Sequence, residues 1–189
     1  PLPIFGKHTL QNFQAARYVC RELGLSDQQI IEAIAQFKGA AKRLETLSKT
    51  KQQVVYKDFA HAPSKVKATI QAVKSQYPSR ALLAVLELHT FSSLTLEFLD
   101  EYLGSMGAAD EAYVYYNKHT IEMKKLKAIE PTDVEDAFYH PNLTVFTKAT
   151  ELESALQVKL DQENNNLLLM SSGNWGGIDI VQMVKESNV

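Results

Sequence analysis

Three short segments place acids, imidazoles and hydroxyls directly after apolar runs, where side chains can bind a ligand. They read D-F-A-H-A-P from Asp58, E-L-H-T-F-S-S from Glu87 and S-S-G-N-W-G-G from Ser171. A carboxylate such as Asp58 can accept two hydroxyl hydrogen bonds, as a ribose offers. Glycines after a strand let a helix N-terminus approach an anion. The candidate ligand-binding residues are therefore Asp58, His61, His89, Ser92, Ser93, Ser171, Ser172 and Asn174.

The same residues have a structural interpretation. Asp58 can cap the turn before a helix that Pro63 begins, because such turns and caps are common. A single His is usually structural, and no second His lies three or four residues from His61 or His89, so the spacing does not indicate a metal site. The glycines at 173–177 do not form the G-x-G-x-x-G fingerprint of dinucleotide sites. From these residues alone both interpretations stay open.

The composition limits the function classes. The 189 residues are 45% hydrophobic and 22% charged with a formal net charge of -2, as in a globular protein with a substantial core. Without a basic field we expect no nucleic-acid partner, and no apolar run is long enough to span a membrane. Cys20 is the only cysteine, so no internal disulfide can form. We expect a protein of the reducing cytoplasm.

Strand and helix patterns alternate from Val54 onward, which predicts a parallel sheet with helices on both faces. A polar turn joins two further strand patterns within 45–59, and 117–142 is predicted to be a long connection with one short helix. Unbroken apolar runs predict buried strands, and helical periodicity fills the intervals. The strands are 81–88, 111–116, 143–147 and 166–172, and the helices are 63–77, 94–106, 150–162 and 176–186.

The first 40 residues predict a separate pair of helices. Apolar residues recur at helical spacing over 9–23, and Gly24 is a natural terminator. Ser26 and Gln29 form a capping-box pattern before a second helix at 26–37. We predict a domain boundary at Lys38–Lys42. Arg43 follows it, and an Arg at a hinge can reach a phosphate, with a surface ion pair as the alternative.

The motifs occur in one order that resembles the Mur ligase family. They are G-K-H-x-x-x-N-x-x-A-A, F-K-G-x-x-x-R-L-E, D-F-A-H-x-P, V-L-E-L-H-T and L-L-M-S-S-G-N-W-G-G-I, and they cover almost the whole chain. The resemblance implies an ATP- and Mg²⁺-dependent enzyme that joins amino acids or peptides to UDP-N-acetylmuramate through an acyl phosphate. It also implies a Rossmann-like three-layer α/β/α fold with a mostly parallel sheet of about six strands.

The resemblance assigns parts and roles. Residues 1–41 correspond to the helical end of the central ATPase domain, and 42–189 to the C-terminal domain that binds the amine. No G-x-x-G-K-[ST] occurs here, so ATP and Mg²⁺ would be bound mainly elsewhere and the chain alone would be inactive. Asn12, Arg43 and Asp58 correspond to ATP-binding positions, although Thr9 departs from the family's Asn. His61, His89, Ser92, Ser93, Ser171, Ser172 and Asn174 would face the amine substrate.

Within the family, the glycine-rich motif M-S-S-G-N-W-G-G-I near the C-terminus and the V-L-E-L strand resemble those of the murein peptide ligases. These enzymes attach the tripeptide L-alanyl-γ-D-glutamyl-meso-diaminopimelate. The alternative is the branch that attaches free L-alanine, but Ser93 stands where that branch has an Arg. Two other classes remain as alternatives: a non-catalytic α/β binding module, and an NAD- or flavin-binding domain. We expect a monomer.

Overall fold

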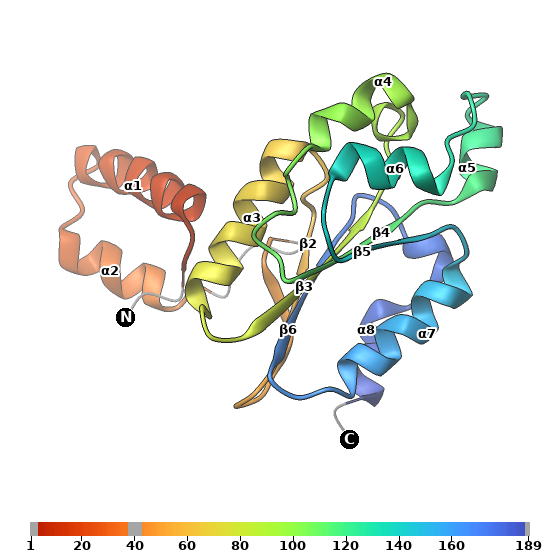
Figure 1. Ribbon diagram of the computed structural model, residues 1–189. Helices are drawn as coiled ribbons and strands as arrows, with labels where there is room; N and C mark the ends of the chain where they lie inside the picture. The colour runs from red at the N-terminus through yellow and green to blue at the C-terminus, as the bar shows by residue number, and fades with distance from the viewer. Residues whose placement is uncertain (1–3, 38–42, 188–189) are drawn as a thin grey trace.

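The structure is a computed structural model that describes residues 4–37 and 43–187. The predicted boundary at 38–42 lies outside the described residues. Within them strands and helices alternate from Val54 onward as the patterns predict, after a separate pair of helices and a first strand at Glu45–Lys49 (Figure 1).

A six-stranded sheet forms the centre of the fold, in the order β1-β2-β6-β3-β4-β5. β1 runs antiparallel to β2, and the remaining neighbours are parallel. The strands are β1 (Glu45–Lys49), β2 (Val54–Asp58), β3 (Ala81–Glu87), β4 (Glu111–Tyr115), β5 (Leu143–Phe146) and β6 (Asn165–Met170). This confirms the predicted three-layer, mostly parallel α/β fold.

Helices cover both faces of the sheet (Figure 1). One apolar core joins the sheet to the layer of α3, α4, α5 and α6, and a second core joins it to α7 and α8. The helices are α3 (Pro63–Gln76), α4 (Leu96–Leu99), α5 (Lys118–Met123), α6 (Pro131–Phe138), α7 (Ala149–Leu160) and α8 (Ile180–Glu186).

Alternation along the strands decides which layer each side chain meets. In β2, Val54 and Tyr56 pack in the first core, whereas Val55 packs in the second. Lys57 therefore turns toward the α7–α8 layer and Asp58 toward the α3 layer. In β3, Leu83 and Val85 belong to the second core, so Glu87 turns toward the α7–α8 layer as well.

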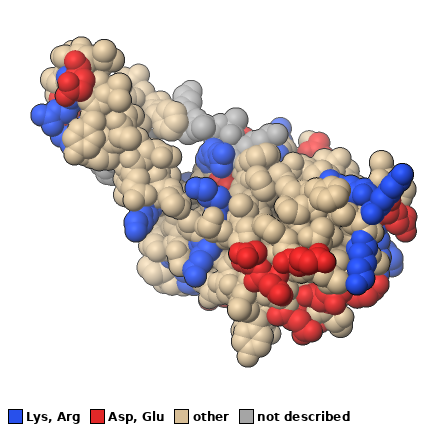
Figure 2. Space-filling model, turned by 90° about the horizontal axis from the view of Figure 1, so that it is seen from above, with Lys and Arg blue, Asp and Glu red and all other residues tan. Residues whose placement is uncertain are grey.

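The helical pair, α1 (Lys7–Glu22) and α2 (Asp27–Ala35), projects from the body beside α3 (Figures 1 and 2). The predicted capping box of Ser26 and Gln29 is present. The apolar face predicted for the first helix is not covered: α1 buries no residue, and α2 buries only Ile30. Leu10, Val19 and Leu23 are 47%, 61% and 76% exposed.

Three predicted helix boundaries were wrong. The helix predicted at 94–106 is a short α4 between two 3₁₀ turns, because Leu103 is extended and Gly104 has a φ of 64°. The connection at 117–142 holds two short helices, α5 and α6. α8 begins at Ile180, after a 3₁₀ turn, because residues 175–177 have positive φ and Ile178 is extended. None of the described helices is both long and apolar enough to cross a membrane.

Candidate functional site

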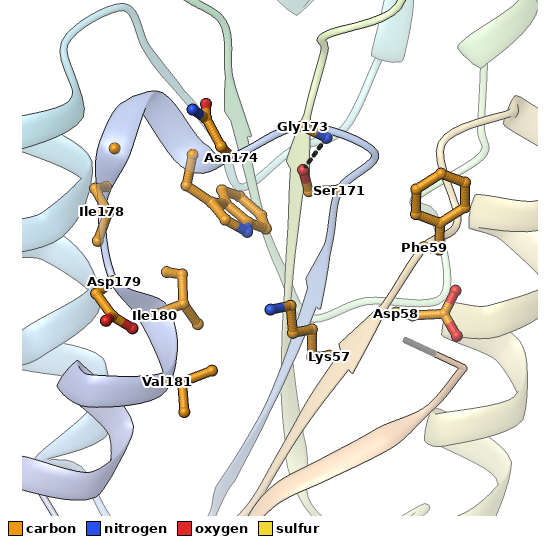
Figure 3. Close-up of a pocket in the computed structure, with 12 residues that line it drawn as sticks. Lys57, Asp58, Phe59, Ser171, Gly173, Asn174, Ile178, Asp179, Ile180 and Val181 are labelled. Atoms are coloured by element: carbon orange, nitrogen blue, oxygen red, sulfur yellow. Dashed lines mark hydrogen bonds between the residues drawn. The ribbon is translucent and has the colours of Figure 1, made fainter. Parts of the chain in front are cut away.

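The carboxyl ends of three adjacent strands, β2, β6 and β3, bring the three predicted loops to one edge of the sheet. The Ser171 N–H donates to the Asp58 carbonyl at 3.0 Å, which joins two of these loops directly. Between the end of β2, the loop after β6 and α8 lies a hollow of about 400 Å³ (Figure 3). Its lining is Lys57, Asp58, Phe59, Ser171, Gly173, Asn174, Trp175, Gly177, Ile178, Asp179, Ile180 and Val181.

A buried carboxylate organises the loop after β6. Glu87 is 3% exposed, and its Oε2 accepts hydrogen bonds from the Ser171 hydroxyl and, at 3.0 Å, from the Trp175 N–H. The Ser171 Oγ in turn accepts the Gly173 N–H at 2.7 Å (Figure 3). His89 Nδ1 lies 3.7 Å from Glu87 Oε1. Since a buried carboxylate is costly unless its oxygens are hydrogen-bonded, this network fixes the loop's shape.

Glycine is required at two positions of this loop for different reasons. A Cβ on Gly173 would lie 2.5 Å from the His89 ring and 2.8 Å from Glu87 Oε2. A Cβ on Gly176 would lie 2.2 Å from the Tyr115 hydroxyl, and Gly176 also has a φ of 64°. Trp175 has a φ of 59°, which is unusual for a bulky residue. Its burial at 3% exposure and the bond to Glu87 hold it there.

Asp58 is turned into the protein. Its Oδ2 accepts the Leu44 N–H and its Oδ1 accepts the Ala60 N–H, each at 2.7 Å. The side chain is 5% exposed. Burial raises the pKa of Asp58, while the two N–H groups and the charge of Arg43 oppose that rise. Two backbone donors therefore draw the Asp58 carboxylate inward.

Asp58 also fastens the segment that follows residues 38–42. Leu44 has a φ of 44°, a left-handed conformation that its N–H bond to Asp58 supports. The Arg43 guanidinium carbon lies 5.8 Å from the centre of the Phe59 ring, within the range of a cation–π contact. The structure therefore brings Arg43 to Asp58 and Phe59, which begin fifteen residues further along the chain.

The two predicted histidines occupy different surroundings. His61 lies edge-on to the Phe59 ring, and its Nδ1 is 2.8 Å from the Phe59 carbonyl. The Tyr102 hydroxyl donates to the His61 carbonyl. His89 packs on Gly173 and Glu87 instead, so it belongs to the loop after β6.

Of the other predicted residues, only some reach the hollow. Ser171 and Asn174 line it. Ser93 is 1% exposed, and its hydroxyl bonds within its own turn, to Thr90. Ser92 is exposed in that turn, and the Ser172 hydroxyl is buried without a hydrogen-bond partner among the described residues. Asn12 is exposed on α1, outside the lining of the hollow.

Sequence reasoning missed the roles of Glu87, Trp175 and Lys57. Strand alternation could have predicted the orientation of two of them. Lys57 lies two residues after Val55 and Glu87 two residues after Val85, so both side chains point to the same face as those core residues, toward α7 and α8. No sequence pattern predicts the left-handed conformation of Trp175. Among residues 4–37 and 43–187, no group of three or more His, Cys, Asp or Glu side chains could hold a metal ion.

The carboxyl edge of the sheet can be compared with the contacts that a nucleotide would need from Asp58 and Arg43. A ribose contact by Asp58 would share two oxygens that already accept backbone N–H groups. Carboxylate oxygens have further acceptor capacity, but the low exposure of Asp58 requires the segment at 43–44 to move for a ligand to use it. Arg43 is exposed at the same edge. In the described conformation Arg43 is exposed near the Phe59 ring, and Asp58 accepts the Leu44 and Ala60 N–H groups.

Comparisons with known proteins agree with this architecture. The family model described as "Mur ligase, glutamate ligase domain" matches residues 42–173. The chain is 30% identical over 176 residues to UDP-N-acetylmuramate–L-alanine ligase of Lactococcus lactis subsp. cremoris, which covers 92% of this chain. The chain spans 37% of the length of that relative.

Two solved structures share the fold. The UDP-N-acetylmuramate–alanine ligase of Thermotoga maritima aligns with a TM-score of 0.72 at 19% identity, over 99% of this chain and 38% of that one. A murein peptide ligase from Psychrobacter arcticus aligns with a TM-score of 0.62 at 20% identity, over 98% of this chain and 38% of that one. With the family model covering more than half of its residues, the chain belongs to the Mur ligase family, with its C-terminal domain at residues 42–173.

Proposed function

We propose that this chain is the amine-binding part of an ATP-dependent ligase that joins L-alanine to UDP-N-acetylmuramate in the bacterial cytoplasm. The similarity to the Lactococcus lactis alanine ligase across 92% of the chain carries this proposal. Because the chain spans 37% of that relative, ATP, Mg²⁺ and the UDP-sugar would be bound mainly by other parts of the full-length protein. On this proposal, residues 1–41 end the central ATPase domain.

The residues of this chain would position substrates. Bound ATP would supply the phosphoryl group that activates the muramate carboxylate, and the amine would then attack the activated carbonyl carbon. Ser171 and Asn174 line the hollow in which the amine would lie. Glu87 holds the loop that carries both. Orienting the amine in this way accounts for most of what such a domain can contribute to the rate.

Arg43 and Asp58 would act at the nucleotide edge. The exposed Arg43 would reach a phosphate when the parts of the enzyme close, and Asp58 would hold the Leu44 backbone that carries it. This closure would exclude water from a labile acyl phosphate. A direct ribose contact by Asp58 and an adenine contact by Asn12 stay predictions.

One observation favours a second candidate, the ligation of the tripeptide L-alanyl-γ-D-glutamyl-meso-diaminopimelate. Ser93 stands where the alanine-adding branch has an Arg, and it is buried with its hydroxyl bonded within its own turn. A free alanine would therefore find no cation at that position. The closing S-S-G-N-W-G-G-I motif supports the same candidate.

The test uses the full-length protein with UDP-N-acetylmuramate and Mg-ATP. Phosphate release is measured with L-alanine, with the tripeptide and with neither amine. Release that depends on L-alanine supports the proposal, and release that depends on the tripeptide alone supports the second candidate. Release that is equal with and without amine would rule out both.

A further inference from the structure

The hollow beside β2 contains a cation with no described ion-pair partner. Lys57 lines it, and Figure 3 shows the Lys57 ammonium directed from β2 into the space toward α8. Other lysines have a carboxylate oxygen within 2.6–2.8 Å: Lys74, Lys118, Lys148 and Lys159. Among residues 4–37 and 43–187, none of the ion pairs within 4.0 Å involves Lys57.

Glu45 lies opposite Lys57 in the β1–β2 register. The carboxylates that line the hollow, and that of Glu87, are hydrogen-bonded within the protein. Asp58 turns to the opposite face and accepts two backbone N–H groups. Glu87 accepts hydrogen bonds from Ser171 and Trp175. Asp179 caps α8 by accepting the Gln182 N–H at 3.0 Å. The charge of Lys57 is therefore available to an anion that enters the hollow.

The rest of the lining indicates the chemistry of that anion. Ile178, Ile180 and Val181 form an apolar wall facing Lys57 (Figure 3). The exposed Asn174 amide adds a group that can both donate and accept hydrogen bonds. Asp58 and Asp179 also line the hollow, and both carboxylates accept backbone N–H groups. One cation, one amide and this apolar wall match a ligand with one carboxylate and a small aliphatic part.

A phosphate fits this lining less well. Phosphate sites usually offer several backbone N–H groups that converge on the anion. In the loop after β6, the N–H groups of Gly173, Trp175, Gly177 and Ile178 all donate to acceptors within the protein. The geometry thus favours a carboxylate.

We propose that Lys57 binds the carboxylate of the incoming amine substrate in this hollow. The inference rests on the proposed function and adds a positioning residue to it. Lys57, on β2, would supply the positive charge that Ser93 does not offer. Since the carboxylate is not the reacting group, Lys57 would set affinity and orientation for the amine rather than activate it.

The test compares two variants of the full-length enzyme with two substrates. In Lys57→Met, we expect the KM for L-alanine to rise roughly 10- to 100-fold, the size of a lost charge-assisted hydrogen bond, with the KM for ATP unchanged. With L-alaninamide, which has no carboxylate, Lys57→Met and the unsubstituted enzyme should have the same KM. Lys57→Arg should restore most of the affinity for L-alanine.

A second variant keeps the test independent of the folding of Lys57→Met. Val181→Asp places a carboxylate on the wall facing Lys57, at a half-buried position in the first turn of α8 where acids are tolerated. It should raise the KM for L-alanine and leave that for L-alaninamide unchanged. Lys67→Met, on the exposed surface of α3, is the matched control and should change neither value.

The possible failures are distinguishable. An active enzyme in which Lys57→Met and Val181→Asp leave the KM for L-alanine unchanged would overturn this inference and keep the proposed function. An equal rise in KM for L-alanine and L-alaninamide would also overturn it, because the effect would not depend on the carboxylate. An unsubstituted enzyme that uses no amine would overturn both.

Discussion

At Gly173 a side chain would collide with the buried carboxylate that organises the loop after β6. In Gly173→Ala the new Cβ would meet His89 Cγ at 2.5 Å, His89 Nδ1 at 2.7 Å and Glu87 Oε2 at 2.8 Å, where ordinary contacts begin at 3.4 Å. The His89 side chain is 39% exposed and can swing away. Glu87 is buried, so its carboxylate would have to move by about 0.6 Å within a packed network.

That displacement should cost stability as overpacking does, about 1–3 kcal/mol. Moving Glu87 Oε2 lengthens its bond to the Trp175 N–H, now 3.0 Å. For a chain of this size we therefore expect the Tm to fall by roughly 2–12 °C. The emission of Trp175, the only tryptophan, should change with it.

The assay is thermal and urea unfolding of the 189-residue chain, followed by Trp175 fluorescence and circular dichroism. Gly107→Ala is the matched control, because a Cβ there meets only the Gly104 carbonyl at 3.5 Å, and we expect a change within about 0.5 kcal/mol. Adding His89→Ala to Gly173→Ala should recover part of the loss. A Gly173→Ala protein with the Tm and emission of the unsubstituted chain would refute the crowding argument.

Three further predictions concern single side chains. The pKa of Asp58 is raised above 3.8 in the folded state, so its contribution to stability is fully present below pH 3.8 and is lost as pH rises through the raised pKa. The unfolding free energy of the unsubstituted chain minus that of Asp58→Asn should therefore fall as pH rises through this window. A difference that is independent of pH would contradict this prediction. Glu87→Gln should cost about 1–3 kcal/mol, because the hydrogen bonds from Ser171 and Trp175 would go to a neutral amide oxygen and lose their charge assistance; unchanged urea unfolding would contradict this. Ser26→Ala should reduce the helicity of α2 and cost about 0.5–2 kcal/mol through loss of its capping box, measured by circular dichroism against the exposed control Ser64→Ala.

The strands were predictable because buried parallel strands are continuous apolar runs. The runs at 81–88 and 166–172 correspond to β3 and β6, which are central in the sheet. The hollow forms because the ends of β2, β6 and β3 lie side by side. This order depends on pairings between strands that are distant in sequence, such as Asp58 with Met170. No local pattern specifies these pairings.

The predicted site was less complete than the fold. The sequence placed Asp58 at a strand end, but whether its carboxylate turns outward depends on the Leu44 N–H, fourteen residues away. Ser93 and Ser171 look alike in sequence, yet one is buried in its own turn and the other lines the hollow. Lys57 was overlooked because it lies within a strand pattern, where alternation alone decides which layer it meets.

The helix errors have a local cause. The apolar periodicity across 94–106 continues through Gly104, but a left-handed residue ends a helix regardless of periodicity. The left-handed turn at 175–177 delays α8 in the same way.

We propose that the full-length protein ligates an amine to UDP-N-acetylmuramate in a reaction driven by ATP. Mass spectrometry of the UDP-linked product, after incubation with Mg-ATP and an equal mixture of L-alanine and the tripeptide, tests it most directly. We expect a product heavier by one alanine residue, formed only when ATP is present. Unmodified UDP-N-acetylmuramate, with both amines and ATP present, would contradict it.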